Sequence, residues 1–229
     1  MSPRAILFDL DETLTDRSKS LMKYSNAFME RFNYYLMDVT SEHVYRLLKA
    51  ADGNGYRSRD EVFAQLVQEL PWSTLPPETS QMNEHWSLTF PLCSEPTFGM
   101  YELLDDLKSR GIILGIVTNG GTISQNKKID SLGIRDYFET IIISETVKMK
   151  KPDAGIFNLG LKESNVDASE TWYIGDHPTN DILGSSNAGL TPVWIRGIHP
   201  WVDGNREPKY QIDSINQVLS LIQAVRSMN

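Results

Sequence analysis

Residues 4–16 read Arg-Ala-Ile-Leu-Phe-Asp-Leu-Asp-Glu-Thr-Leu-Thr-Asp. The apolar run Ala5–Phe8 is typical of a strand buried in a parallel sheet. Asp9 and Asp11 follow directly, where the strand gives way to a loop. Two buried neighbouring carboxylates are costly unless a cation or hydrogen-bond donors compensate their charge. Because open α/β sheets carry their active sites at the carboxyl ends of the strands, this stretch predicts a metal-assisted carboxylate site.

Three further apolar runs are each followed by a polar motif. Residues 112–117 lead into Thr118-Asn119-Gly120-Gly121, and residues 140–143 precede a lysine-rich segment that ends Lys150-Lys151-Pro152-Asp153. Residues 172–174 lead into Gly175-Asp176-His177-Pro178-Thr179-Asn180-Asp181. Aspartate at a strand end is also a common turn or capping residue, so the first motif alone leaves both readings open. Four motifs at four predicted strand ends favour one shared site.

This order of motifs resembles the phosphatase branch of the haloacid dehalogenase-like (HAD) superfamily, from about residue 4 to residue 196. The resemblance implies that Asp9 is the nucleophile and Asp11 the general acid and base. It implies a Mg²⁺ site made by Asp9, Asp11 (through its backbone carbonyl) and Asp176, with Asp181 one layer behind, orienting water or Lys151. It also implies phosphate binding by the following residues: Leu10, Thr118, Asn119 and Lys151.

Simpler interpretations exist for several of these residues. Thr118-Asn119-Gly120-Gly121 is also a turn sequence, and Lys151 stands in a basic run, where a solvated lysine is the alternative. His177 is expected to be a loop residue rather than a catalytic one. The other histidines show no metal-ligand spacing, and we expect surface or packing roles for them: His43, His85 and His199.

The fold class predicted is α/β, a Rossmann-like parallel sheet core with an inserted helical cap domain. From residue 100 onward, short apolar strands alternate with helical segments, as crossover connections in a parallel sheet require. The core is expected to comprise residues 1–16 and 96–229, with helices at 100–110, 122–132, 181–188 and 214–227. Residues 17–95 are helix-rich and resemble the HAD cap. Three helical segments are expected there, followed by a return path broken by prolines: Pro76, Pro77 and Pro91.

The segment from Asp52 to Arg59 contains two glycines and is predicted to be a loop between two cap helices. In capped relatives, the corresponding loop faces the active site and recognises the leaving group. Tyr56 offers an aromatic face, and Arg57 and Arg59 offer forked donors, so these three are candidate specificity residues. The alternative is a surface loop whose arginines pair with Asp60 or Glu61.

Composition limits the partners. The 229-residue chain is 40% hydrophobic and 23% charged, and its length allows one large domain or two small ones. Its formal net charge of −8 disfavours nucleic acid or an anionic membrane as partner, but a cleft with Lys151 and Mg²⁺ still suits a small phosphorylated metabolite. A lone Cys93 excludes an internal disulfide, and no membrane-length run or signal peptide is found. We expect a cytoplasmic monomer or homodimer.

The predicted function is therefore a Mg²⁺-dependent phosphatase acting through an aspartyl-phosphate. A phosphotransferase of the sugar-phosphate mutase type would carry the same motifs, so it stays open. A haloacid dehalogenase shares the fold but needs no metal and lacks the second aspartate, so Asp11 argues against it. The complete motif set also disfavours a non-catalytic binding protein. Sugar phosphates, phosphoglycolate and nucleoside monophosphates all remain candidate substrates, with a slight preference for the nucleotidase type.

Overall fold

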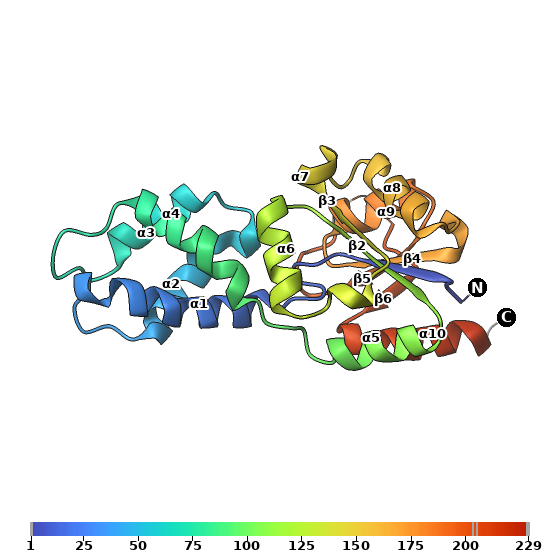
Figure 1. Ribbon diagram of the computed structural model, residues 1–229, viewed down its shortest axis with the longest axis horizontal. Helices are drawn as coiled ribbons and strands as arrows, with labels where there is room; N and C mark the ends of the chain where they lie inside the picture. The colour runs from blue at the N-terminus through green and yellow to red at the C-terminus, as the bar shows by residue number, and fades with distance from the viewer. Residues whose placement is uncertain (1, 203, 205, 228–229) are drawn as a thin grey trace. The chain divides into compact units, whose positions relative to one another are not determined.

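The computed structural model describes residues 2–202, 204 and 206–227. The chain folds into two compact units: a core built from the residues up to 16 and from 96 onward, and a cap built from residues 17–95. Figure 1 traces the helices and strands of both units. None of the helices within the described ranges is long and apolar enough to cross a lipid bilayer.

The core is built on a parallel sheet of six strands in the order β3-β2-β1-β4-β5-β6. The strands are β1 (Ala5–Phe8), β2 (Ile113–Thr118), β3 (Thr140–Ile143), β4 (Thr171–Gly175), β5 (Thr191–Ile195) and β6 (Tyr210–Ile212). Phe8 at the end of β1 lies opposite Ile116 of β2 and Ile174 of β4, so the carboxyl ends of the three strands meet at one edge. The predicted α/β class is confirmed. Strand β6 was not predicted, because a three-residue strand has too little pattern to recognise.

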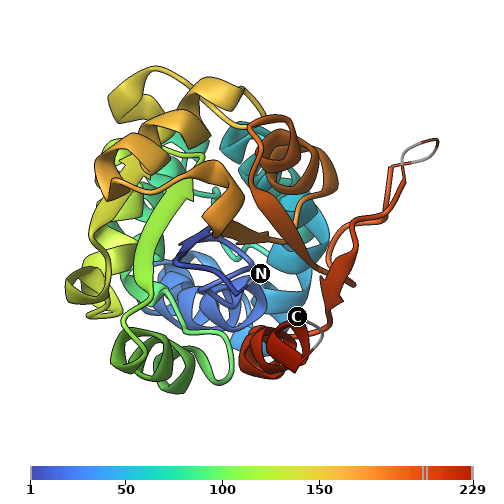
Figure 2. The ribbon, with the colours of Figure 1, turned by 90° about the vertical axis from the view of Figure 1, so that its right-hand side faces the viewer.

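Helices cover both faces of this sheet. Ile6 and Phe8 point to one face, in a core shared with α5 (Met100–Ser109), α6 (Thr122–Ser131) and α10 (Val218–Ser227). Leu7 points to the other face, where it packs with α8 (Ala154–Ser164); α7 (Ser144–Val147) and α9 (Gly184–Asn187) are on the same side. Figures 1 and 2 show α5 and α10 side by side on one face. This alternation follows from the two-residue period of a strand.

Most predicted core helices are found close to their expected ends, with one clear difference. The segment expected as a helix from 181 begins earlier, as a π-helical turn at Pro178–Leu183 that continues into α9. His177 causes the earlier start, because its Nδ1 accepts hydrogen bonds from the backbone N–H groups of Thr179 and Asn180. His177 thus has a structural role in the loop, as expected.

The cap contains four long helices rather than the three expected: α1 (Arg17–Phe32), α2 (Ser41–Asp52), α3 (Arg59–Glu69) and α4 (Thr79–Thr89). The prolines expected to interrupt the return path instead flank α4, and a capping box between Glu78 and Gln81 starts it. Only Met82 and Trp86 of α4 are buried, so its hydrophobic pattern is weak. Trp86 stacks on Phe90 and meets Tyr24 of α1 edge-on, which anchors the helix in the core of the cap.

Candidate active site

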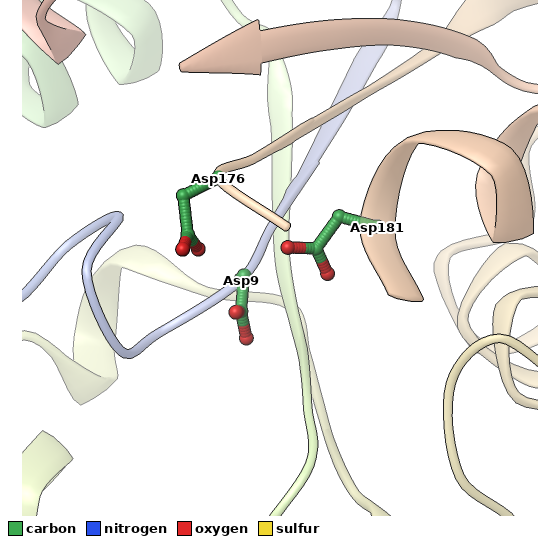
Figure 3. Close-up of side chains that lie close together, drawn as sticks. All are labelled: Asp9, Asp176 and Asp181. Atoms are coloured by element: carbon green, nitrogen blue, oxygen red, sulfur yellow. The ribbon is translucent and has the colours of Figure 1, made fainter. Parts of the chain in front are cut away.

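Three aspartates converge at the carboxyl edge of the sheet. Asp9 follows β1, Asp176 follows β4, and Asp181 lies on the π-helical turn. One carboxylate oxygen from each lies within 4.8 Å of the others, and all three residues are buried. Figure 3 shows the three side chains gathered around the end of β1. The backbone N–H of Asp9 donates to the carbonyl of Ile174, which couples the two strand ends at 2.9 Å.

Gly175 lets Asp181 come this close. A Cβ atom at residue 175 would lie 2.5 Å from Cγ of Asp181, well inside van der Waals contact. The Asp181 carboxylate accepts two hydrogen bonds. Its Oδ2 accepts one from the backbone N–H of His177 at 2.9 Å, and its Oδ1 accepts one from Lys151 Nζ at 2.6 Å. Asp181 is therefore held within the protein by both oxygens.

Lys151 joins the aspartates electrostatically. Its Nζ lies 2.7 Å from Oδ1 of Asp9, 2.6 Å from Oδ1 of Asp181 and 2.9 Å from the hydroxyl of Tyr173. The lysine is only 2% exposed, so the alternative of a solvated lysine is wrong. Asn119 fixes the Lys151 backbone, because its side-chain amide accepts the Lys151 N–H at 2.8 Å and donates to the Lys151 carbonyl at 3.0 Å. This role of the Asn119 side chain was not predicted.

Burial sets the protonation behaviour of the cluster. Desolvation raises the pKa of Asp9 to about 7, against the opposing charge of Lys151. Desolvation and the neighbouring carboxylates of Asp181 and Asp9 raise the pKa of Asp176 to about 9. Burial lowers the pKa of Lys151, but Asp181 and Asp9 outweigh it, and the net shift is upward. Burial and mutual repulsion therefore oppose ionisation of Asp9 and Asp176, and a further positive charge at the site would favour their ionised forms.

Asp11 lies apart from this cluster. Both oxygens of its carboxylate accept hydrogen bonds from Lys128 Nζ, at 2.7 and 2.8 Å, and one of them also accepts a hydrogen bond from Gln125 Nε2 at 3.0 Å. Gln125 also donates to the hydroxyl of Thr118 at 2.8 Å. The Asp11 side chain is thus engaged by α6. Leu10 is fully buried, and its carbonyl accepts hydrogen bonds from the backbone N–H groups of Leu14 and Thr15, both at 2.9 Å.

Three residues of the site were not predicted, namely Gln125, Lys128 and Tyr173, and His199 was expected to be a surface or packing residue. His199 Nε2 in fact lies 3.4 Å from Oδ2 of Asp176, in the loop that follows β5. No local spacing connects His199 with its partner, because the two come from different strand ends. Gln125 and Lys128 did carry a signal: they are three residues apart on the helix that follows Thr118 and so share one face.

The candidate specificity residues of the cap have partners within the cap. The carboxylate of the buried Asp52 accepts two hydrogen bonds from the guanidinium group of Arg17, both at 2.6 Å, and one from that of Arg59 at 2.9 Å. Although burial raises the pKa of Asp52, these two guanidinium groups outweigh it and hold the pKa below its usual value. Arg57 donates to the carbonyl of Ala51 and to Gln65, while Tyr56 is 62% exposed.

Of the two acidic residues considered as alternative partners of these arginines, Glu61 feels the charge of Arg57, which acts after the Ser58 hydrogen bonds in lowering the pKa of Glu61. Asp60 accepts a hydrogen bond from Asn83, and Glu61 forms the capping box of α3 with Ser58.

Comparison with known proteins identifies the family of the chain. Residues 6–195 match the family model of haloacid dehalogenase-like hydrolases. The chain is 32% identical to a glyceraldehyde 3-phosphate phosphatase of Pyrococcus abyssi (84% of this chain, 81% of the relative). It is also 32% identical to the pyrimidine 5'-nucleotidase YjjG of Escherichia coli (95% and 96%). Its fold resembles the crystal structure of the HAD hydrolase YfnB of Bacillus subtilis, with a TM-score of 0.75 at 24% identity over 97% of this chain and 99% of that one. The chain therefore belongs to the haloacid dehalogenase-like hydrolases, and its curated relatives include phosphatases and nucleotidases.

Proposed function

We propose that the protein is a Mg²⁺-dependent phosphatase that hydrolyses a small phosphorylated metabolite through a phosphorylated Asp9. One observation carries the proposal: Asp9, Asp176 and Asp181 converge at the carboxyl edge of the sheet, with the buried Lys151 bridging two of them. A phosphate dianion repels a carboxylate nucleophile unless cations mask the charge. The phosphatase relatives support the same reaction class.

The donor set fits Mg²⁺. Among the described residues, the potential ligands that gather in a group of three are the carboxylates of Asp9, Asp176 and Asp181, although the His199 imidazole lies beside Asp176. Mg²⁺ prefers such hard oxygen ligands. Buried carboxylates with raised pKa values gain stability when a cation joins them. Asp9, Asp176 and the backbone carbonyl of Asp11 would hold the ion. When bound, Mg²⁺ would supply positive charge that masks the phosphate and the nucleophile.

In the first half of the reaction, an Asp9 oxygen attacks phosphorus and the bond to the leaving oxygen breaks. The leaving oxygen keeps the electron pair and takes a proton from the Asp11 carboxyl group, so the alcohol departs. Lys151 neutralises charge on Asp9 and on the phosphate. Gln125 donates to the Thr118 oxygen at 2.8 Å, and the Thr118 hydroxyl donates to the Asn119 carbonyl over a long 3.5 Å, a weak contact that a phosphate oxygen would replace.

In the second half, a water oxygen attacks the phosphorus of phospho-Asp9. The bond between phosphorus and the Asp9 oxygen breaks, and its electron pair returns to the Asp9 carboxylate. Asp11, now a carboxylate, accepts the proton of the water. Inorganic phosphate leaves, and both aspartates regain their starting forms.

Two alternative enzyme classes differ from a phosphatase in the group that accepts the phosphoryl group or in the group that leaves. A sugar-phosphate mutase would use the same first half but pass the phosphoryl group to a second hydroxyl instead of water. A dehalogenase would release halide and would have no use for Asp11. Sugar phosphates, phosphoglycolate and nucleoside monophosphates are the substrate classes we propose to separate by assay.

A panel of these phosphorylated metabolites, with detection of free phosphate, tests the proposal. We expect Mg²⁺-dependent phosphate release that is lost in EDTA and restored by added Mg²⁺. Full activity in thoroughly metal-stripped protein would reject the metal assignment. Halide release from a 2-haloacid, without phosphate release from any ester, would reject the phosphatase. Isomerised sugar phosphate without free phosphate would identify a mutase.

A further inference from the structure

The carboxylate of Asp11 is held by two side chains of α6 that belong to none of the four sequence motifs. Lys128 Nζ reaches both of its oxygens, at 2.7 and 2.8 Å, and Gln125 Nε2 reaches Oδ2 at 3.0 Å. Thr15 adds a longer contact of 3.4 Å from its hydroxyl to Oδ1. We name Gln125 and Lys128 together the α6 clamp.

The clamp is far more buried than the group it holds. The side chain of Lys128 is 7% exposed, while that of Asp11 is 32% exposed. Gln125 is also buried and connects the clamp to Thr118 by a 2.8 Å hydrogen bond. Burying a lysine is expensive unless a partner accepts its protons, and Asp11 is the acidic partner of Lys128. The clamp thus joins the general acid and base to the phosphate-binding strand end.

The donors of the clamp define which form of Asp11 they hold. An ammonium and an amide NH₂ can only donate, so both Asp11 oxygens must act as acceptors. The clamp therefore favours the carboxylate form of Asp11 over the carboxyl group. In the proposed reaction, Asp11 is a carboxyl group when it protonates the leaving oxygen and a carboxylate afterwards, when phospho-Asp9 awaits water.

We propose that Lys128, assisted by Gln125, is a positioning residue for the second half of the reaction, in which Asp11 removes a proton from the attacking water. The inference rests on the proposed phosphatase function. Loss of Lys128 should slow hydrolysis of phospho-Asp9 more than its formation. A lysine that serves only to stabilise the fold would slow both steps alike.

para-Nitrophenyl phosphate separates the two steps, because para-nitrophenolate leaves without needing a proton from Asp11. Rapid mixing of enzyme with this ester in Mg²⁺ gives a burst of nitrophenolate that reports phosphorylation, and steady-state phosphate release reports hydrolysis. The variants are Lys128→Met, which keeps the length without the charge, Lys128→Gln as a second neutral variant, and Lys128→Arg as a rescue. Lys127→Met is the matched control, because Lys127 is the half-buried neighbour of Lys128 on α6. Circular dichroism checks the fold of each variant.

For Lys128→Met we expect a burst rate close to that of the wild type and a kcat lower by about 10- to 100-fold, the effect of losing one charge-assisted hydrogen bond. KM should fall in parallel, so kcat/KM changes little, and phosphorylated Asp9 should accumulate and be found by mass spectrometry. Lys128→Gln should show the same pattern, Lys128→Arg should recover most of kcat, and Lys127→Met should match the wild type.

An equal loss of the burst rate and the steady-state rate in both neutral variants would refute the proposed positioning role of Lys128. Neutral variants that match Lys127→Met in both rates would refute it as well. A wild type that forms no phosphoenzyme and releases no phosphate would instead overturn the proposed function, and this inference with it. The two failures are therefore distinguishable in one set of measurements.

Discussion

Replacing Asp176 by asparagine should stabilise the metal-free protein at neutral pH. Burial and the carboxylates of Asp181 and Asp9 raise the pKa of Asp176 from 3.8 to about 9. At pH 7 the folded state therefore keeps this carboxyl protonated, whereas the unfolded chain ionises it. The interval of about 3 pH units between 3.8 and 7 corresponds to a loss of up to about 4 kcal/mol in the free energy of unfolding. Asparagine is nearly isosteric and cannot ionise, so it removes this loss.

The direction of the pH dependence follows from the raised pKa. The contribution of Asp176 to stability is complete below pH 3.8 and is lost as the pH rises through about 9. The melting temperature of the variant should therefore exceed that of the wild type by an amount that grows between pH 5 and pH 9. At about 2–4 °C per kcal/mol, the gap at pH 7 is at most roughly 8–16 °C.

Thermal melts in EDTA, with and without excess Mg²⁺, measure both effects. Mg²⁺ should raise the melting temperature of the wild type, more strongly at higher pH, because a bound metal needs its ligands deprotonated. It should raise that of Asp176→Asn much less. Asp136→Asn, a change to an exposed aspartate of the core, is the control and should follow the wild type. Identical melting curves for wild type and Asp176→Asn in EDTA, or an equal Mg²⁺ response, would refute this account of the site.

Four further substitutions probe the site and the cap. Asp9→Asn should abolish turnover and phosphoenzyme, while Asp11→Asn should still be phosphorylated by para-nitrophenyl phosphate yet lose most turnover; a phosphoaspartate mapped elsewhere by mass spectrometry would contradict this. Gly175→Ala should displace Asp181, since the new Cβ would lie 2.5 Å from its Cγ, and should lower the free energy of unfolding in denaturant by about 1–3 kcal/mol. An unchanged unfolding curve would show that the turn carrying Asp181 can move without loss of stability. Arg57→Ala should lower kcat/KM for the physiological substrate by about ten- to a hundredfold with little effect on para-nitrophenyl phosphate; equal effects on both esters would exclude this loop from specificity.

Sequence reasoning predicted those features that are encoded locally. The strand preceding Asp9 and the strands preceding Thr118 and Asp176 are short apolar runs that end in polar motifs, so their class and direction follow from composition and the rules of parallel sheets. The same reasoning missed α4, since its hydrophobic pattern is weak and only two of its residues are buried. It also missed β6, which is too short to have a pattern.

The sequence by itself determined that aspartates, a threonine and a lysine stand at the ends of parallel strands, because strand direction places those ends at one edge. Only the tertiary structure decided which of them touch. The bridge from Lys151 to Asp9 and Asp181, the engagement of Asp11 by Lys128 and the approach of His199 to Asp176 join residues far apart in the chain. Such pairs leave no periodic trace, since their geometry is set by the order of the strands in the sheet and by the packing of helices on its faces.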